Sequence, residues 1–262
     1  GMKITVLVEN HSDGGCTAKH GFSRYIETER HKLLFDLGPD ETIFENASRL
    51  GIDLTSVDTV IISHGHNDHG GALGRFLEMN HTAQVYLQKT AFRPHYSTSG
   101  GKHSIGLDTS LMGHPQLVLL DGDTRLDEEL MLFTVKDGYN RCLSEANSNL
   151  LSDEGPDQFE DEQNLMIGSQ LLVMGCGHKG VVNILDAAPC TPKVCIGGYH
   201  LMKPQTGETV SQALLEEIAQ QLKMRPVTYY TCHCTGQQAY QVLSGMVPDM
   251  HTLSCGETIE LP

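Results

Sequence analysis

Residues 63–71 carry the strongest signal in the chain and read Ser63-His64-Gly65-His66-Asn67-Asp68-His69-Gly70-Gly71. Four potential metal ligands fall within six residues, after an apolar run at 59–63 and before a predicted helix at 71–79. Alternate side chains at a strand end point the same way, so His64 and His66 can share a direction. The glycine-rich bend turns Asp68 and His69 toward a neighbouring point. Imidazoles and a carboxylate this close can supply two metal ions, and this donor set suits zinc. The alternative is a polar loop that is merely rich in histidine.

Three further histidines stand at the ends of predicted strands. His178 follows the strand 171–175, His200 follows 194–197, and His233 follows 227–231. Because binding groups of α/β sheets gather where strands end, these histidines are candidates for the ligands that the first cluster lacks.

Length and charge limit the classes of function. The 262 residues suggest one domain spanning 1–262, and 18 basic against 33 acidic residues give a net charge of −15. Phosphate backbones and anionic lipid would repel such a chain, so we expect neither nucleic acid nor a membrane as a partner. The first residues show no secretory signal pattern, and the eight cysteines form no C-x-x-C pair. We therefore expect a cytoplasmic protein with reduced thiols.

Hydrophobic periodicity predicts alternating strands and helices. Strands are expected at 3–9, 22–27, 32–36, 59–63, 84–88, 171–175, 194–197, 227–231 and 258–261. Helices are expected at 40–50, 71–79, 179–186, 208–223 and 237–245. The stretches 89–115 and 136–165 show little periodicity and are predicted to be irregular, the first as a lid or a wall of a substrate pocket.

The pattern His64-x-His66-x-Asp68-His69 resembles the defining motif of the metallo-β-lactamase superfamily. Residues 34–38, Leu-Phe-Asp-Leu-Gly, are similar to its early strand, whose Asp supports the metal loop. The resemblance implies an α/β (α+β) fold, a four-layer αββα sandwich of two mixed β-sheets. Segments 161–165, 176–183, 197–201 and 233–236 resemble one subgroup. It contains archaeal 7,8-dihydropterin-6-methyl-4-(β-D-ribofuranosyl)-aminobenzene-5′-phosphate synthases and bacterial metal-dependent hydrolases.

The resemblance also implies a set of ligands. His64, His66 and His178 would hold one metal ion, and Asp68, His69 and His233 the second. Two divalent ions are expected, with Zn²⁺ favoured and Mn²⁺ or Fe²⁺ as alternatives. Many superfamily hydrolases bridge the two metals with an Asp at a strand end where this chain has Tyr199 and His200. We therefore expect His200 to act as a ligand or a substrate-facing acid or base, and Asp68 to be catalytic.

Further side chains are candidates for contact with a small-molecule anionic substrate. His20 resembles a subgroup pattern and is expected to line the pocket. Arg93, Lys102 and His103 could meet an anionic group, the alternative being ordinary surface positions. The Gly-Lys pair at 101–102 lacks the spacing of a phosphate-binding loop. Cys232 and Cys234 are expected to be packing residues. Asp161 is expected to be a hydrogen-bond partner of a ligand histidine.

The function favoured by the resemblance is a metal-dependent hydrolase that acts on a small phosphorylated or ester-like metabolite through metal-activated water. The first alternative is a dihydropteroate-type synthase (a transferase) that joins a hydroxymethyl-dihydropterin diphosphate to an aminobenzene acceptor. The second is a non-catalytic metal-containing sensor. The sequence leaves the substrate and the oligomeric state open.

Overall fold

Two seven-stranded sheets organise the chain in a computed structural model that describes residues 1–262. The chain divides into two compact units, a first unit of residues 1–94, 105–121 and 253–262, and a second unit of residues 95–104 and 122–252. Each unit contains one of the two large sheets. The prediction of a single domain over 1–262 remains a prediction.

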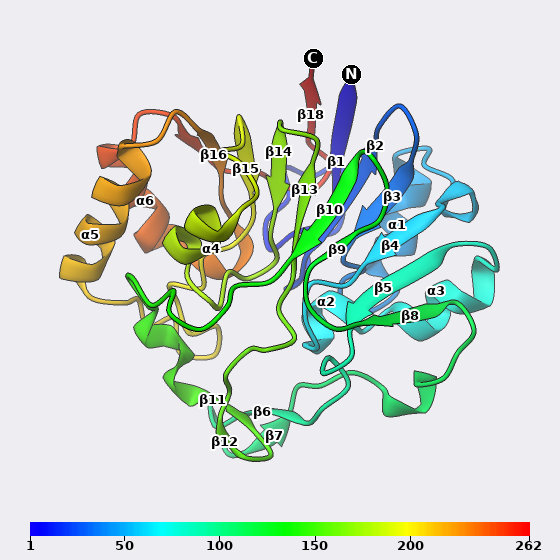
Figure 1. The fold of residues 1–262 in the computed structure, drawn as a ribbon, viewed down its shortest axis with the longest axis horizontal. Coiled ribbons are helices and arrows are strands. Elements are labelled where there is room, and N and C mark those ends of the chain that lie inside the picture. Colours follow the sequence, from blue (N-terminus) through cyan, green and yellow to red (C-terminus); the bar gives the residue numbers. More distant parts are fainter. The chain divides into compact units, whose positions relative to one another are not determined.

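The sheet of the first unit has the order β18-β1-β2-β3-β4-β5-β8. Its strands are β1 (Met2–Val8), β2 (Ser23–Glu27), β3 (Lys32–Phe35), β4 (Thr59–Ile61), β5 (Gln84–Gln88), β8 (Leu117–Leu120) and β18 (Thr258–Leu261). Strands β18, β1, β2 and β3 are antiparallel neighbours, whereas β3, β4, β5 and β8 run parallel. Since β18 pairs with β1, the two chain ends lie side by side (Figure 1).

Two helices pack against this sheet, α1 (Thr42–Arg49) and α3 (Leu73–Met79). Ile43 of α1 and Phe76 of α3 share a buried apolar cluster with strand residues such as Val60. The turn η1 (Leu54–Ser56) precedes β4 in the chain, and the short helix α2 (Asn67–Gly70) follows it. All three residues of β4 are buried, as expected of a parallel strand covered on both faces.

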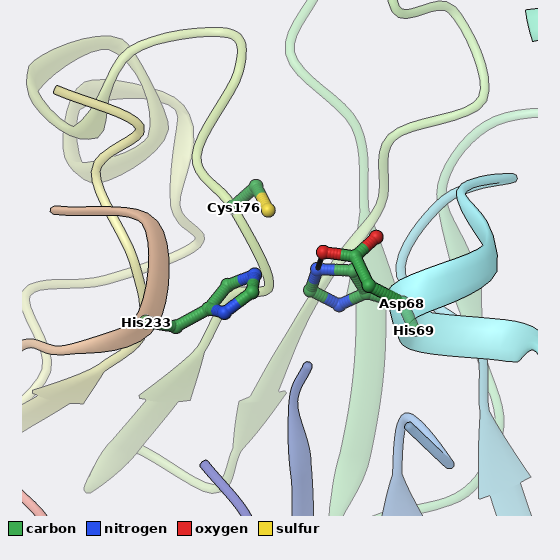
Figure 2. A group of neighbouring side chains, drawn as sticks. All are labelled: Asp68, His69, Cys176 and His233. Atoms are coloured by element: carbon green, nitrogen blue, oxygen red, sulfur yellow. Dashed lines mark ion pairs between the residues drawn. The ribbon is translucent and has the colours of Figure 1, made fainter. Parts of the chain in front are cut away.

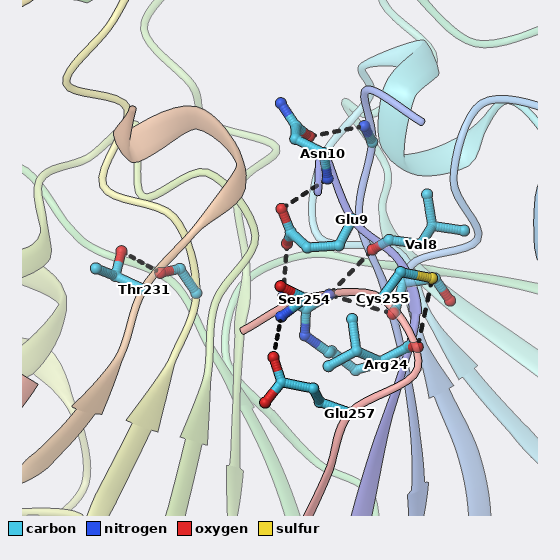
Figure 3. A network of polar contacts seen from close by, with 12 residues as sticks. Val8, Glu9, Asn10, Arg24, Thr231, Ser254, Cys255 and Glu257 are labelled. Carbon is cyan, nitrogen blue, oxygen red and sulfur yellow. Dashed lines mark hydrogen bonds and ion pairs between the residues drawn. The ribbon is translucent and has the colours of Figure 1, made fainter. Parts of the chain in front are cut away.

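A buried ion pair ties β1 to β2 in the first unit. Arg24 Nη2 lies 2.8 Å from Glu9 Oε1, and neither side chain is exposed to solvent (Figure 3). Arg24 also donates to the carbonyl oxygen of Val8, and its guanidinium lies 3.9 Å from the ring centroid of Phe22. Both charges are thus compensated where β1 ends and β2 begins.

The sheet of the second unit has the order β17-β16-β15-β14-β13-β10-β9. Its strands are β9 (Thr124–Arg125), β10 (Leu130–Phe133), β13 (Asn164–Ile167), β14 (Leu171–Val173), β15 (Val194–Ile196), β16 (Thr228–Tyr230) and β17 (Met250–His251). Strands β14 to β17 run parallel, so the turns that follow β14, β15 and β16 leave the same edge of the sheet. That edge is where the three predicted histidines stand.

Three helices gather beside β14, β15 and β16 (Figure 1), α4 (Val181–Ala187), α5 (Gln212–Lys223) and α6 (Gln237–Met246). Leu214, Ile218 and Leu222 of α5 recur every fourth residue and are buried in the core of this unit. Helix α5 begins after Ser211, whose side-chain oxygen accepts a hydrogen bond from the backbone N–H of Leu214. The cap explains why the helix starts later than the predicted residue 208.

The two stretches predicted to be irregular contain short strands, so that prediction is wrong in part. A four-stranded sheet with the order β12-β11-β6-β7 forms in the second unit. Its strands are β6 (His95–Ser97), β7 (His103–Ser104), β11 (Leu150–Ser152) and β12 (Gly155–Pro156), and the turns η2 (Thr109–Leu111) and η3 (Glu145–Asn149) lie nearby in sequence. Strands of two or three residues are too short to show an alternating pattern, and their pairing fixes them instead. None of the helices is both long and apolar enough to cross a membrane.

Candidate metal centre

The histidine-rich loop packs its imidazoles tightly in the first unit. It leaves the sheet after β4, and His64, His66 and His69 are all buried. The ring centroid of His64 lies 4.5 Å from that of His66 and 4.3 Å from that of His69. The loop therefore gathers the predicted ligands of this unit at one place.

Asp36 holds this loop in shape. It follows β3 with a positive φ of 63°, a conformation that Asp tolerates better than most residues, and its side chain is fully buried. One carboxylate oxygen accepts the backbone N–H of Ser63 at 2.7 Å, and the other accepts the Ser63 hydroxyl at 2.7 Å and His69 Nδ1 at 2.6 Å. The supporting role that the family resemblance implies for Asp36 is confirmed by these bonds.

These hydrogen bonds also fix which nitrogen each imidazole can offer to a metal. A carboxylate only accepts, so Nδ1 of His69 carries the proton and Nε2 keeps its lone pair. The Ser63 hydroxyl gives its single proton to Asp36, so it accepts from His64 Nδ1, which lies 2.8 Å away. Nε2 of His64 is therefore also left as the basic nitrogen.

Asp68 and His69 project from α2 (Figure 2). The Oδ2 atom of Asp68 lies 3.6 Å from His69 Nε2 and 3.4 Å from His20 Nε2. Asn10 Nδ2 donates to His20 Nδ1 at 3.0 Å, which leaves the His20 proton on Nε2, facing Asp68. His20 is 45% exposed and Asp68 17%, so this pair reaches from the ligand loop to solvent.

In the second unit His178 is clamped by two side chains. Asn147 Oδ1 lies 2.9 Å from His178 Nδ1, and Asn147 Nδ2 donates to the carbonyl oxygen of His178. The two carboxylate oxygens of Glu162 accept the backbone N–H groups of His178 and Lys179 at 2.8 and 2.9 Å. Burial raises the pKa of Glu162 to about 7, although these two backbone hydrogen bonds act to lower it.

Two more strand-end histidines of this unit adopt strained backbone conformations. His200 has φ 47° and His233 has φ 56°, both in the left-handed region, and both side chains are buried. His200 Nε2 lies 3.2 Å from the carbonyl oxygen of Ala146, and its ring centroid is 4.4 Å from that of His178. Parallel strands thus bring all three histidines to one sheet edge, as predicted.

Two cysteines join these histidines within the second unit. The Cys176 sulfur, the Cys234 sulfur and an imidazole nitrogen of His200 lie within 4.8 Å of one another. The Cys234 thiol also donates to the carbonyl oxygen of Cys176 at 3.5 Å. Cys234 was expected to be a packing residue, and these contacts show that it has polar partners as well.

The donors of both units fit a divalent metal of the zinc type. They are buried imidazoles, a carboxylate and thiols, and in three of the imidazoles Nδ1 is bonded to an oxygen of Asp36, Ser63 or Asn147. Metal-binding histidines in proteins are commonly oriented in this way, with the other ring nitrogen directed at the metal. The side chains of these groups therefore fit a divalent metal ion.

The remaining predicted substrate residues are exposed. Arg93 belongs to the first unit. Lys102 and His103 belong to the second unit, where the Lys102 ammonium lies 4.5 Å from the ring centroid of Tyr96 and His103 Nδ1 is 2.8 Å from the carbonyl oxygen of Gly101. Their contact with a substrate stays a prediction.

Several residues of the site escaped sequence reasoning. Asn147 and Glu162 lie in a stretch without periodicity and among mostly polar neighbours, so neither stands out by its pattern. The only signal was the resemblance of residues 161–165 to a subgroup segment, which includes Glu162. The spacing Cys176-Gly177-His178 was a usable signal, because alternate residues point the same way. Asp161, expected beside a ligand histidine, instead has its Oδ2 3.3 Å from His95 Nε2, while Asp157 Oδ2 is 2.8 Å from His95 Nδ1.

Comparison with known proteins agrees with this geometry. Residues 17–142 match the family model described as the metallo-beta-lactamase superfamily. A 7,8-dihydropterin-6-methyl-4-(beta-D-ribofuranosyl)-aminobenzene-5′-phosphate synthase of Methanocaldococcus jannaschii is 26% identical over 293 residues, which cover 99% of this chain and 96% of the relative. An uncharacterized protein of the same organism is 26% identical, over 92% of this chain and 93% of its own.

A solved structure extends the match to the fold. The crystal structure of a metal-dependent hydrolase of the β-lactamase superfamily is similar with a TM-score of 0.84 and 27% identity, covering 100% of this chain and 99% of that one. The predicted fold class is confirmed by this similarity and by the two sheets of mixed strand orientation. Residues 17–142 therefore match the metallo-β-lactamase superfamily, and the whole chain shares the fold of a solved structure described as a member of the β-lactamase superfamily.

Proposed function

We propose that the chain is a metal-dependent hydrolase that holds two divalent metal ions, with zinc favoured. His64, His66 and His178 would bind one ion, and Asp68, His69 and His233 the other. The observation that carries the proposal is the set of hydrogen bonds by which Asp36, Ser63 and Asn147 leave Nε2 of His69, His64 and His178 as the ligand nitrogen. The similar solved structure is described as a metal-dependent hydrolase, which supports the same reaction class.

The chain's own residues would handle the protons of the reaction. When bound, a pair of zinc ions lowers the pKa of water and polarises a substrate oxygen. Asp68 would orient the attacking water and carry a proton to the leaving group through its carboxylate. His20 would exchange that proton with solvent, because its Nε2 lies 3.4 Å from Asp68 and its side chain is partly exposed.

The substrate would be a small phosphorylated or ester-like metabolite with an anionic group. Arg93, Lys102 and His103 are the exposed cationic or titratable side chains assigned to that group. His200 would serve as a substrate-facing acid or base, since its Nε2 is engaged by the carbonyl oxygen of Ala146 and its Nδ1 has no hydrogen-bond partner. The net charge of −15 disfavours a nucleic acid as substrate.

A synthase is the second candidate, because the synthase relative matches over 99% of this chain. The same residues would then hold the metal ions. The diphosphate of a hydroxymethyl-dihydropterin would be the leaving group when the aminobenzene acceptor attacks. Water is consumed in the first reaction and not in the second. The two functions therefore differ in the fate of solvent oxygen.

Turnover in ¹⁸O-labelled water distinguishes the two functions. The zinc-loaded protein is given phosphodiesters and esters in one series, and hydroxymethyl-dihydropterin diphosphate with an aminobenzene acceptor in another. The hydrolase proposal predicts ¹⁸O in the product of the first series, lost in Asp68→Asn and kept in the control Asp137→Asn, an exposed carboxylate. Coupling without ¹⁸O uptake in the second series would favour the synthase. Metal binding without turnover in either series would contradict both and favour a sensor.

A further inference from the structure

The proposed ligand set is short of negative charge. Many superfamily hydrolases place a bridging Asp where this chain has Tyr199 and His200. Tyr199 is buried in the core of the second unit, and burial raises the pKa of its phenol well above the usual value, so it stays neutral. His200 is an imidazole held by the carbonyl oxygen of Ala146. Among the six proposed ligands, Asp68 would be the only anion.

One thiol of the second unit lies close to the proposed ligand histidines of that unit. The sulfur of Cys176 is within 4.8 Å of an imidazole nitrogen of His178, of His233 and of His200. His178 and His233 are the ligands that this unit would give to two different metal ions. The Cys176 thiol and the His233 imidazole lie next to each other in Figure 2. The Cys176 sulfur is therefore close to both of the histidines that this unit would give to the metal ions.

The backbone around Cys176 is built to hold this position. Gly177 has a φ of +61°, and a Cβ added there would lie 2.6 Å from the carbonyl oxygen of Gly198, so a glycine is required between Cys176 and His178. The Cys234 thiol donates to the carbonyl oxygen of Cys176. The Cys176 side chain is buried, with a relative exposure of 3% for the residue. It is thus fixed and not free to swing to solvent.

We propose that Cys176, as a thiolate, is the anionic ligand shared by the two metal ions in place of the usual carboxylate. This inference rests on the proposed two-metal function. Binding would convert the Cys176 S–H into a sulfur–metal bond and release the proton to solvent, without any redox change. Thiolate ligands select zinc over hard ions such as manganese. The inference therefore also favours zinc over Mn²⁺ at this centre.

Cobalt(II) is the probe, because a thiolate bound to Co²⁺ adds a sulfur-to-metal charge-transfer absorption in the near ultraviolet. The full-length protein is stripped of metal and reloaded with Co²⁺, and bound metal per chain is counted by plasma mass spectrometry. The variants are Cys176→Ser, Cys176→Asp and the control Cys190→Ser, which removes an exposed thiol of the same unit. Circular dichroism of each metal-free variant checks the fold.

The parent and Cys190→Ser are expected to bind about two Co²⁺ with the charge-transfer absorption. Cys176→Ser should lose the absorption and bind cobalt about tenfold more weakly or worse, since even partners outside the ligand set contribute that much. Cys176→Asp should bind about two Co²⁺ without the absorption, because a carboxylate replaces the sulfur. If Cys176→Ser does not fold, the absence or presence of the charge-transfer absorption in Cys176→Asp tests whether Cys176 is the thiolate ligand.

Two results would overturn the inference. An absorption that persists without the Cys176 sulfur assigns the thiolate to another cysteine. A parent that binds two Co²⁺ without any charge-transfer absorption refutes the thiolate bridge and leaves the two-metal proposal standing. A parent that binds no pair of metal ions refutes both.

Discussion

At Asp36 a single buried carboxylate accepts three hydrogen bonds, two from Ser63 and one from His69. The backbone of Asp36 is strained, because its φ is positive although the residue is not a glycine. The Asp36 carboxylate fixes the path of the histidine-rich loop and leaves Nε2 as the basic nitrogen of His69. The chemistry of the loop therefore depends on a residue that is not itself a proposed ligand.

Replacement of Asp36 should weaken metal binding. Asp36→Asn keeps the shape of the side chain but replaces an acceptor oxygen with a donor N–H₂ group, so one of the bonds to Ser63 or His69 is lost. Zinc affinity is expected to fall about 10- to 100-fold, measured by competition with a chromogenic chelator. The matched control is Asp58→Asn, because Asp58 also lies 2.6 Å from a histidine, His31, on the surface of the same unit. Equal loss in both variants would contradict the account.

His95 is held between two carboxylates in the second unit. Burial opposes its protonation, but hydrogen bonds and charges from Asp157 and Asp161 outweigh burial and raise the pKa of His95 to about 10 from 6.5. Below pH 6.5 the folded and unfolded chains both hold this proton. Between pH 6.5 and 10 only the folded chain holds it, so stability is lost as the pH rises through that window.

The pH prediction concerns the free energy of unfolding. The parent should lose about 1.4 kcal/mol per pH unit relative to His95→Gln between pH 7 and 9. The difference is measured by urea denaturation of metal-free protein at each pH. The His95 ring signals in nuclear magnetic resonance, assigned with the same variant, should show a protonated imidazole at pH 8. An imidazole that loses its proton near pH 6.5 would contradict the prediction.

At the scale of elements, the turn after β14 depends on Glu162 from the loop before β13. Its carboxylate accepts two successive backbone N–H groups, those of His178 and Lys179. Glu162→Gln can satisfy only one of them. At pH 8, above its pKa of about 7, the change should cost about 1–3 kcal/mol of unfolding free energy in metal-free protein. The exposed neighbour variant Glu160→Gln should change the midpoint of urea denaturation little, and an equally small change in Glu162→Gln would refute the role.

The ion pair that joins β1 and β2 gives a second element-scale prediction. Glu9→Gln leaves the fully buried Arg24 without its counter-charge, which should cost about 3–5 kcal/mol of unfolding free energy. The control Glu41→Gln breaks the exposed pair with Arg75 and should cost at most about 0.5 kcal/mol. Thermal and urea denaturation followed by circular dichroism measure both. Similar losses in the two variants would show that burial does not set the strength of this pair.

Many strands and helices could be predicted from the sequence, but the apolar strands β8 and β10 were not among them. The strands at 84–88 and 258–261 have their predicted bounds, and the helix predicted at 237–245 extends one residue further, to Met246. The strands of the small sheet have only two or three residues, so their own sequence says little. Pairing with partners more than fifty residues away, as between β6 and β11, fixes them instead.

For the whole molecule, the order of the motifs along the chain indicated which residues belong to the candidate site. Each unit gathers its own predicted ligands, the first around His64 and His69, the second around His178 and His233. What the sequence could not indicate is which residues act on the ligands through their position, such as Asn147, which holds His178. Their side chains acquire a role only from the tertiary fold.

The central proposal is that the six predicted ligands hold a pair of metal ions. Anomalous diffraction at the zinc absorption edge, on crystals of the zinc-loaded full-length protein, tests it most directly. The account predicts two anomalous peaks, one in contact with His64, His66 and His178 and the other with Asp68, His69 and His233. A single peak, or no peak at these residues, would contradict it.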